Sequence, residues 1–179
     1  MGRKCRNRTT SAAMIKRLVM PFTRGAPSLA EAVGRDAPAI SALHGASFRR
    51  GWSEEEVETL IADRQVCTHV CTYRAVLRGP RLAGFVMSRR AGDEAEILSV
   101  AVASARRGRG LARALLDLHL RRLAGFGVRA VFLEVDEQNR PALRLYARAG
   151  FREVGRRPNY YSGAGGSAAS ALVLRRDLN

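Results

Sequence analysis

The chain has 179 residues, of which 31 are Lys or Arg and 16 are Asp or Glu, so its formal net charge is +15. This length predicts a single domain, and the 46% share of hydrophobic residues excludes disorder for most of the chain. A transmembrane span is also excluded, because no stretch approaches the ~18 uninterrupted apolar residues that a membrane helix needs.

Positive charge is concentrated at the N-terminus, where residues 1–27 contain no acid and show no apolar periodicity. We expect a disordered basic leader there, followed by one domain over residues 28–179; whether residues 1–19 belong to the natural protein stays open. A basic protein suits an anionic neighbour such as RNA, a phosphorylated cofactor or an acidic protein, but a solvated arginine-rich surface explains the charge equally well. Three cysteines do not form a disulfide scaffold, and we expect a reducing, cytoplasmic setting.

The first part of the expected domain reads as one strand and two helices. Residues 29–33 form a short strand, and residues 36–48 an Ala-rich helix with Asp36 at its N-cap. Ser53 and Glu56 are spaced as a capping box, which begins a second helix that ends near Arg64.

The pattern then changes to short strands, over residues 66–77, 82–89 and 94–103. Turn signals at Gly79-Pro80 and Gly92-Asp93 separate them. Turns this short require an antiparallel meander.

The second half predicts alternating strands and helices. A helix over residues 108–125 has an apolar face that includes Leu111, Leu115, Leu118 and Leu123. It is followed by a strand (128–135) and a second helix (139–149). Two closing strands (152–156 and 169–176) end the domain, with a loop between them at 163–166. The helix between strands 94–103 and 128–135 makes these two parallel. The expected fold is therefore a mixed α/β sheet.

An anion site is predicted where the third strand of the meander ends and the first long helix begins. Val100-Ala101-Val102 ends the strand, a turn carries Arg106, Arg107, Gly108, Arg109 and Gly110, and Leu111-Ala112 opens the helix. A helix N-terminus offers unpaired N–H groups and a positive dipole end, and glycine lets the backbone approach a pyrophosphate. This turn predicts a phosphorylated cofactor.

Two other phosphate motifs fit less well. A dinucleotide fold would use Gly108-x-Gly110 with Glu134 as the ribose-binding acid, but Arg113 stands where the third glycine belongs. The preceding meander is also wrong for a doubly wound sheet. The turn also lacks the Lys-Ser/Thr pair that a P-loop requires.

Arg107-x-x-Gly110-x-Ala112 after a strand resembles the acetyl-CoA pyrophosphate loop of the GNAT superfamily of N-acetyltransferases. The resemblance covers about residues 28–176 and continues in Phe48, Trp52-Ser53-Glu54, Leu133-Glu134-Val135, Asn139, Ala142-Leu143-x-Leu145-Tyr146, Gly150-Phe151 and Tyr160-Tyr161. The combination is similar to the bacterial ribosomal-protein alanine N-acetyltransferase (RimI-type) branch. It implies a sheet whose parallel pair splays at the acetyl-CoA site, with helices on both faces.

The resemblance also implies roles for single residues. The backbone of Val100, Ala101 and Val102 would pair with the pantetheine arm, and the pyrophosphate would lie against Arg107, Gly108, Arg109, Gly110, Leu111 and Ala112, with Asn139 as a further contact. Glu134 would be the general base and Tyr146 the general acid for the CoA sulfur. From the residues alone, Glu134 could instead face solvent, Tyr146 could pack in the core, and Asn139 could cap its helix.

The resemblance also implies which segments flank the acceptor. Trp52, Tyr160 and Tyr161 fall on segments that flank the acceptor cleft of this family, although Trp52 could instead join the two N-terminal helices. Relatives carry an acidic pair after the two tyrosines, where this chain has a Gly/Ser/Ala stretch at 165–170. The acids at the start of the second helix are an alternative partner for a basic acceptor.

Cys67-x-His69-x-Cys71 would lie on one strand face, but zinc needs a fourth ligand and we expect no metal. His44 and His119 read as structural.

We therefore predict acetyl transfer from acetyl-CoA to an α-amine, with the N-terminal alanine of a ribosomal protein as acceptor, in a ternary complex. A monomer or weak dimer is expected, with weak RNA or ribosome contact through the basic surface. The alternatives are a small-molecule amine or lysine side chain as acceptor, and a non-catalytic RNA-binding module.

Overall fold

The computed structural model of the chain describes residues 26–75, 79–162 and 168–178. The strands are β1 (Ser28–Glu31), β2 (Val66–Ala75), β3 (Gly79–Ala91), β4 (Glu94–Val102), β5 (Ala130–Asp136), β6 (Arg152–Ser162) and β7 (Ala168–Asp177). The helices are α1 (Ala37–Gly45), α2 (Glu54–Ala62), α3 (Leu111–Gly125) and α4 (Arg140–Arg148), and short 3-10 turns, η1 (Gly34–Asp36) and η2 (Ser104–Arg106), precede α1 and α3.

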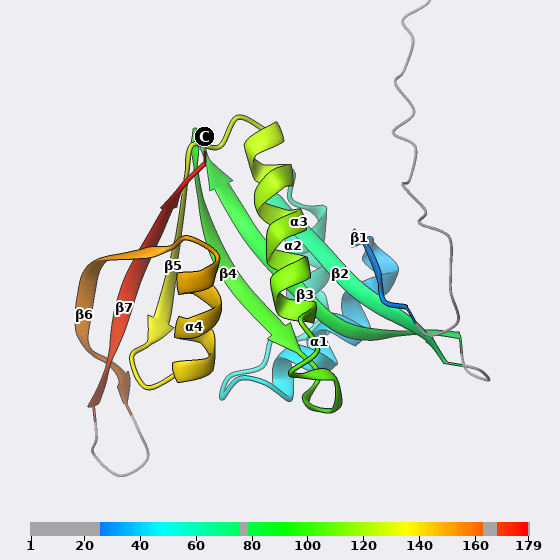
Figure 1. Cartoon of the computed structure of the whole chain (residues 1–179). Helices are drawn as coiled ribbons and strands as arrows, with labels where there is room; N and C mark the ends of the chain where they lie inside the picture. The colour runs from blue at the N-terminus through cyan, green and yellow to red at the C-terminus, as the bar shows by residue number, and fades with distance from the viewer. Residues whose placement is uncertain (1–25, 76–78, 163–167, 179) are drawn as a thin grey trace, which may run out of the picture.

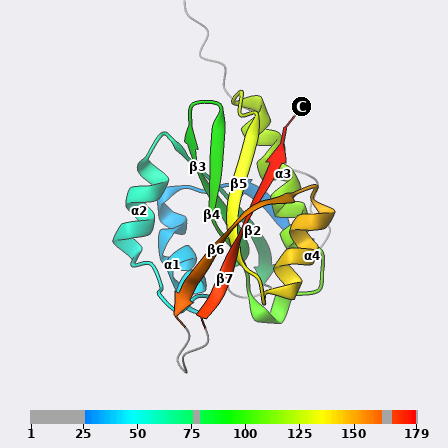
Figure 2. The ribbon, with the colours of Figure 1, turned by 90° about the vertical axis from the view of Figure 1, so that its left-hand side faces the viewer.

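The seven strands form one mixed sheet in the order β1-β2-β3-β4-β5-β7-β6. Only β4 and β5 are parallel, and every other neighbouring pair is antiparallel. Helices α1 and α2 lie on one face of the sheet and α3 and α4 on the other (Figure 1, Figure 2). The predicted mixed α/β fold with helices on both faces is confirmed.

The core is divided by the sheet into two clusters. The larger cluster packs α3 and α4 against side chains such as Val86, Ile97 and Leu133. The smaller cluster packs α1 and α2 against Phe85 and Met87. Alternate residues of β3 therefore enter different clusters, as the period of two along a strand requires.

Several predicted boundaries are confirmed by local chemistry. In α2, the Ser53 hydroxyl accepts from the backbone N–H of Glu56, and the Glu56 carboxylate accepts from that of Ser53, so the capping box is present. The turn at Gly92-Asp93 joins β3 and β4. Among the described residues, no helix has the length and apolar character needed to cross a membrane.

Other boundaries were wrong. Gly79-Pro80 does not form a turn but opens β3, where a proline is tolerated because β4 begins to pair with β3 only at Gly84. The first helix ends at Gly45 rather than at residue 48, and α3 begins at Leu111 rather than at residue 108.

The apolar face of α3 differs in part from the prediction. Leu111, Leu115 and Leu123 are buried as expected, but Leu118 is half-buried. The other buried side chains on this helix are Leu116, His119 and Leu120.

The last hairpin is longer than predicted. The sixth strand continues to Ser162, so the backbone of Tyr160 and Tyr161 lies in a strand and not in a loop. Pro158 lies in β6, which is the outermost strand of the sheet, and a proline without a backbone N–H is tolerated in such an edge strand. The predicted loop at 163–166 and residues 1–25 of the predicted leader lie outside the described residues.

Candidate active site

The two parallel strands separate soon after they begin to pair. Their pairing runs from Glu94 opposite Ala130 to Glu96 opposite Phe132. Beyond this point β4 continues to Val102 along β3, while β5 continues to Asp136 along β7 (Figure 2). The segment predicted to meet the pantetheine arm, residues 100–102, therefore lies on the part of β4 that has left β5.

The predicted pyrophosphate loop connects the end of β4 to α3. Gly108 and Gly110 have φ values of +73° and +76°, a left-handed conformation that glycine adopts without strain. Gly110 is the N-cap of α3, and no side chain caps this helix end. Arg107 donates from Nε to the carbonyl of Val102 over 3.1 Å, which ties the loop to the end of β4, and Arg109 is exposed. The N-terminal N–H groups of α3 therefore have no side-chain cap, and the binding of an anion there stays a prediction.

Glu134 lies on β5 just beyond the point where the strands separate. Its neighbours Leu133 and Val135 point into the core on the α3–α4 face, so its own side chain lies on the α1–α2 face. The side chain is 18% exposed, and one carboxylate oxygen lies 2.9 Å from Nε of Arg157 on β6. The ion pair fixes the direction in which this partly buried carboxylate points.

Tyr146 and Asn139 lie on and before α4, on the opposite face. The Tyr146 ring is 8% exposed and packs edge-on against Phe151, with ring centroids 5.6 Å apart. Asn139 is exposed and accepts from the backbone N–H of Ala142 over 3.2 Å, so it caps α4. The cap is confirmed; the roles of both residues toward CoA stay predictions.

The two predicted catalytic side chains thus approach the sheet from opposite sides, with Glu134 on the α1–α2 face and Tyr146 on the α3–α4 face. Helix α4 is also linked to α3, because Arg113 donates to the carbonyl of Arg148 over 2.6 Å. The pyrophosphate loop, α4 and Tyr146 therefore share one side of the protein.

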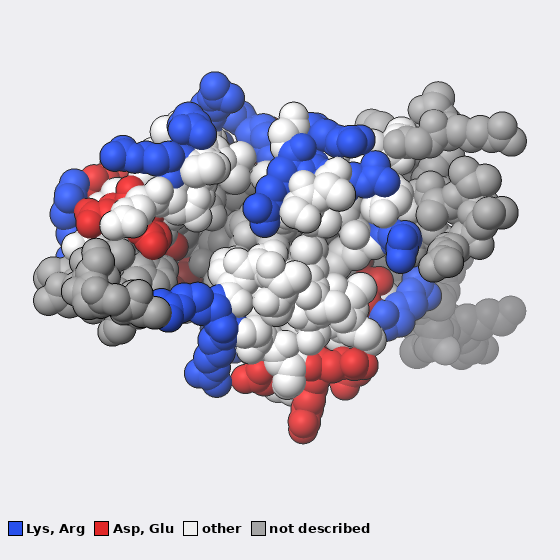
Figure 3. All heavy atoms as spheres, turned by 90° about the horizontal axis from the view of Figure 1, so that it is seen from below, with Lys and Arg blue, Asp and Glu red and all other residues white. Residues whose placement is uncertain are grey.

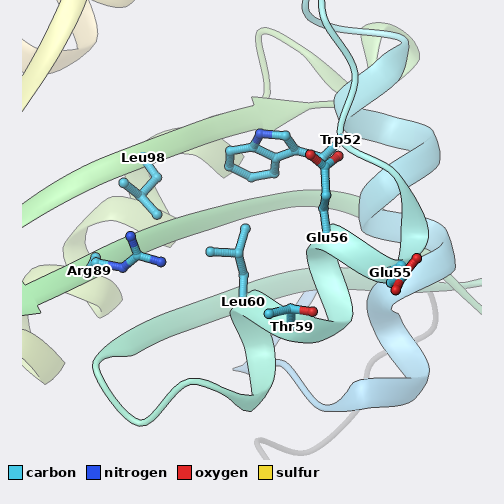
Figure 4. Close-up of a pocket in the computed structure, with 7 residues that line it drawn as sticks. All are labelled: Trp52, Glu55, Glu56, Thr59, Leu60, Arg89 and Leu98. Atoms are coloured by element: carbon cyan, nitrogen blue, oxygen red, sulfur yellow. The ribbon is translucent and has the colours of Figure 1, made fainter.

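A groove of about 490 Å³ opens on the other side, between α2 and the sheet. Trp52 and Leu98 line it together with Glu55, Glu56, Thr59, Leu60 and Arg89 (Figure 4). It combines the apolar side chains of Trp52, Leu60 and Leu98 with two carboxylates and with the guanidinium of Arg89.

His44 fixes Trp52 at the edge of this groove. The two rings are stacked with centroids 3.9 Å apart, and Nδ1 of His44 accepts from the backbone N–H of Trp52 over 3.1 Å. Burial lowers the pKa of His44, and an accepting Nδ1 requires the neutral ring. Trp52 therefore joins the N-terminal helices and also lines the groove, and its role toward an acceptor stays a prediction. The side chains of Tyr160 and Tyr161 lie outside the described part of the structure.

Charge is unevenly distributed over the surface. Figure 3 shows basic side chains along the upper edge and a group of acidic side chains at the lower edge, with a second acidic group among basic side chains at the left. The acids of α2 are Glu54, Glu55, Glu56 and Glu58, and all four are exposed. The basic edge suits an anionic cofactor and the acidic edge a cationic acceptor.

A buried row of polar side chains, which the sequence pattern had only partly indicated, connects the sheet to α3. The hydroxyl of Ser88 lies 2.7 Å from Nε2 of His119, whose Nδ1 lies 2.8 Å from Nδ1 of His69. The thiol of Cys67 lies 3.8 Å from the same His69 nitrogen. His119, fifty positions from His69 in sequence, completes this row, and Cys71 is not part of it. The short nitrogen–nitrogen distance is that of a hydrogen bond.

Comparison with known proteins gives one family. The model of the Acetyltransferase (GNAT) family matches residues 37–151. The [ribosomal protein bS18]-alanine N-acetyltransferase of Escherichia coli K12 is 30% identical over 126 residues, which cover 70% of this chain and 81% of that protein. The crystal structure of the ribosomal-protein-S18-alanine N-acetyltransferase from Escherichia coli superposes with a TM-score of 0.76 at 26% identity, covering 85% of this chain and 94% of that one.

Another relative is much longer than this chain. An uncharacterized protein of Mycobacterium leprae is 36% identical over 119 residues, which are 64% of this chain and only 32% of that protein.

Proposed function

The chain belongs to the GNAT family of acetyltransferases, and from this membership we propose that its acceptor is the α-amine of a protein N-terminus, with the N-terminal alanine of a ribosomal protein as the natural target. The family uses acetyl-CoA as acetyl donor, so the chain is an acetyl-CoA-dependent N-acetyltransferase. The observation that carries the proposal is the separation of β4 and β5 beyond Glu96 and Phe132, with Glu134 just past it.

The cofactor side of the site is formed by β4, α3 and α4. We assign the pantetheine arm to the backbone of Val100–Val102 as an added strand. The pyrophosphate lies at the N-terminus of α3, against Gly108, Gly110 and the Leu111–Ala112 backbone, with Arg107 and Arg109 supplying charge. Asn139 at the start of α4 is the further contact.

The acetyl group then moves in one step, without an acyl-enzyme. The amine nitrogen forms a bond to the acetyl carbon, and the carbon–sulfur bond breaks with its electron pair going to sulfur. Glu134 accepts the amine proton, and Tyr146 donates a proton to the sulfur. This assignment agrees with the faces on which the two side chains lie, since the amine and the thioester then meet from opposite sides of the sheet.

The acceptor side is formed by α1, α2 and the groove beside Trp52. A protein N-terminus that carries basic residues after its first position suits the acids of α2, of which Glu55 and Glu56 also line the groove. From the family resemblance we also assign Tyr160 and Tyr161 to the acceptor side.

The test is CoA release from acetyl-CoA with peptides that differ only in their first residue, or in a blocked amino terminus. We expect release with a free N-terminal alanine and none after blocking. Release with a blocked peptide that contains lysine would show a lysine acetyltransferase, and release with small amines alone would exclude a protein N-terminus. RNA binding without any turnover would favour the alternative function, a non-catalytic RNA-binding module.

A further inference from the structure

Ser99 has a buried hydroxyl without a hydrogen-bond partner among the described residues. The residue is 5% exposed. Thr68 is the one other buried hydroxyl residue of the described chain in this condition. Because leaving a buried polar group unpaired destabilises a fold, such a group requires an explanation.

The local backbone shows why Ser99 points where it does. Along β3 and β4, Met87 lies opposite Ser99 and Ser88 lies opposite Ile97, so Leu98 is an extra residue in β4. Such a bulge turns two consecutive side chains to one face. Met87 belongs to the α1–α2 cluster, and Ser99, directly opposite it, lies on that face.

Ser99 and Glu134 occupy matching places on the two strands that separate. The last parallel pair is Glu96 with Phe132, and Glu134 follows Phe132 by two residues on the α1–α2 face. Ser99 follows Glu96 by three residues, and the extra residue of the bulge brings it to the same face. The hydroxyl and the carboxylate therefore flank the opening from its two sides.

We propose that the Ser99 hydroxyl accepts a hydrogen bond from the acceptor's amino group and holds that group between Glu134 and the thioester. This inference rests on the proposed function. Leu111 at the end of the pyrophosphate loop and Tyr146 lie on the α3–α4 side, whereas Ser99 faces the side of the acceptor groove. Leu98, the preceding residue, lines that groove, so an acceptor lying there reaches the bulge.

The bonding of a primary amine explains why two polar side chains, Ser99 and Glu134, are needed to hold it. A neutral primary amine has two N–H groups and one lone pair. With one N–H on Ser99 and one directed to Glu134, the lone pair is left for the acetyl carbon. During attack the proton on the Glu134 side moves to the carboxylate, and the Ser99 hydroxyl gains or loses no proton.

The test compares Ser99→Ala with Thr68→Val, in the full chain. Thr68 also lies opposite Met87, but on β2, two strands away from β4. It therefore shares the burial and the unpaired hydroxyl of Ser99 without its place beside the opening. Both variants remove an unsatisfied group, so neither is expected to lower Tm, and each is expected to raise it by a few degrees at most.

Steady-state rates with the alanine peptide and acetyl-CoA affinity separate the outcomes. We expect Ser99→Ala to lower kcat/KM for the peptide about tenfold or more with unchanged acetyl-CoA affinity, and Thr68→Val to match the wild type. Wild-type rates in Ser99→Ala, an equal loss in both variants, or a lower Tm in Ser99→Ala would overturn the assignment. Absence of peptide turnover in the wild-type chain would instead overturn the proposed function.

Discussion

The guanidinium of Arg157 on β6 lies against the carboxylate of Glu134 on β5, with Nε 2.9 Å from Oε1. Strand β7 separates these two strands in the sheet, so the pair bridges across it. The arginine is 61% exposed and the glutamate 18% exposed, so the cation reaches in from the surface to a carboxylate that is largely covered. This contact fixes the direction in which the carboxylate of the proposed base points.

Replacing Arg157 by Gln is expected to reduce turnover several-fold and to leave Tm nearly unchanged, because a pair with so exposed a partner contributes only about 0–1 kcal/mol to stability. The matched control is Arg156→Gln. Arg156 is the neighbouring arginine, and it pairs with Glu153 and Glu137 outside the proposed site. Peptide acetylation rates of both variants check this, and equal rates would show that Arg157 does not orient the base.

Replacing Tyr146 by Phe is expected to lower kcat by about 10-fold or more while acetyl-CoA affinity stays close to that of the wild type. The ring that packs against Phe151 is retained, so the fold is preserved and only the hydroxyl is lost. Turnover and acetyl-CoA titration measure the two effects separately. Full turnover in this variant would show that Tyr146 has a packing role only and is not the general acid.

Gly84 supports the end of β4 by its lack of a side chain. A Cβ at this position would lie 2.8 Å from the carbonyl oxygen of Ala101 and 3.0 Å from Cγ2 of Val102. Gly84→Ala is therefore expected to displace the strand predicted to bind pantetheine, and to weaken acetyl-CoA binding as well as stability, by about 1–3 kcal/mol.

The control for this substitution is Gly125→Ala, in the last turn of α3, where an added Cβ meets nothing within 4 Å. Its acetyl-CoA affinity should equal that of the wild type, and its stability should be equal or higher. If Gly84→Ala bound acetyl-CoA as the wild type does, the close approach of β3 and β4 would be irrelevant to the cofactor.

The buried histidines predict acid sensitivity. Burial lowers the pKa of His69 to about 4 and that of His119 to about 3, from an ordinary value of 6.5; nearby Arg122 adds to the first shift and His69 to the second. Between pH 6.5 and the lowered pKa values, the unfolded chain binds more protons than the folded chain. The two neutral imidazoles therefore stabilise the folded chain fully above pH 6.5, and this stabilisation is lost as pH falls toward 4 and 3.

Urea unfolding at several pH values measures this loss. The free energy of unfolding should fall below pH 6.5 with a slope that approaches about 1.4 kcal/mol per pH unit for each of the two imidazoles. His69→Gln should reduce the slope, because one of the two groups no longer titrates. A slope unchanged by this substitution would contradict the assignment.

Sequence patterns were informative where the cause is local. The capping box of Ser53 and Glu56, the cap at Asn139 and the glycine turn before α3 each depend on residues a few positions apart, and all three are present. The parallel pair followed from the helix that connects its strands, and its separation followed from the family resemblance.

Features that depend on distant residues were not predicted. The bulge in β4 depends on the register with β3, and nothing in the Leu98-Ser99 sequence marks it. Likewise, His119 is one polar residue on the apolar face of α3, and only the fold places it against His69 and Ser88. The pair of Glu134 with Arg157 also requires the order of the last three strands, which local patterns do not give.

The central claim is that Glu134 accepts the proton of an α-amine, and the substitution Glu134→Gln tests it most directly. Gln keeps the size of the side chain but does not take up the amine proton. The measurement is turnover with a free N-terminal alanine peptide, paired with an acetyl-CoA titration. The account predicts a fall in kcat of about 100-fold or more with acetyl-CoA affinity within about twofold of the wild type. Wild-type turnover in this variant, or a parallel loss of acetyl-CoA binding, would contradict it.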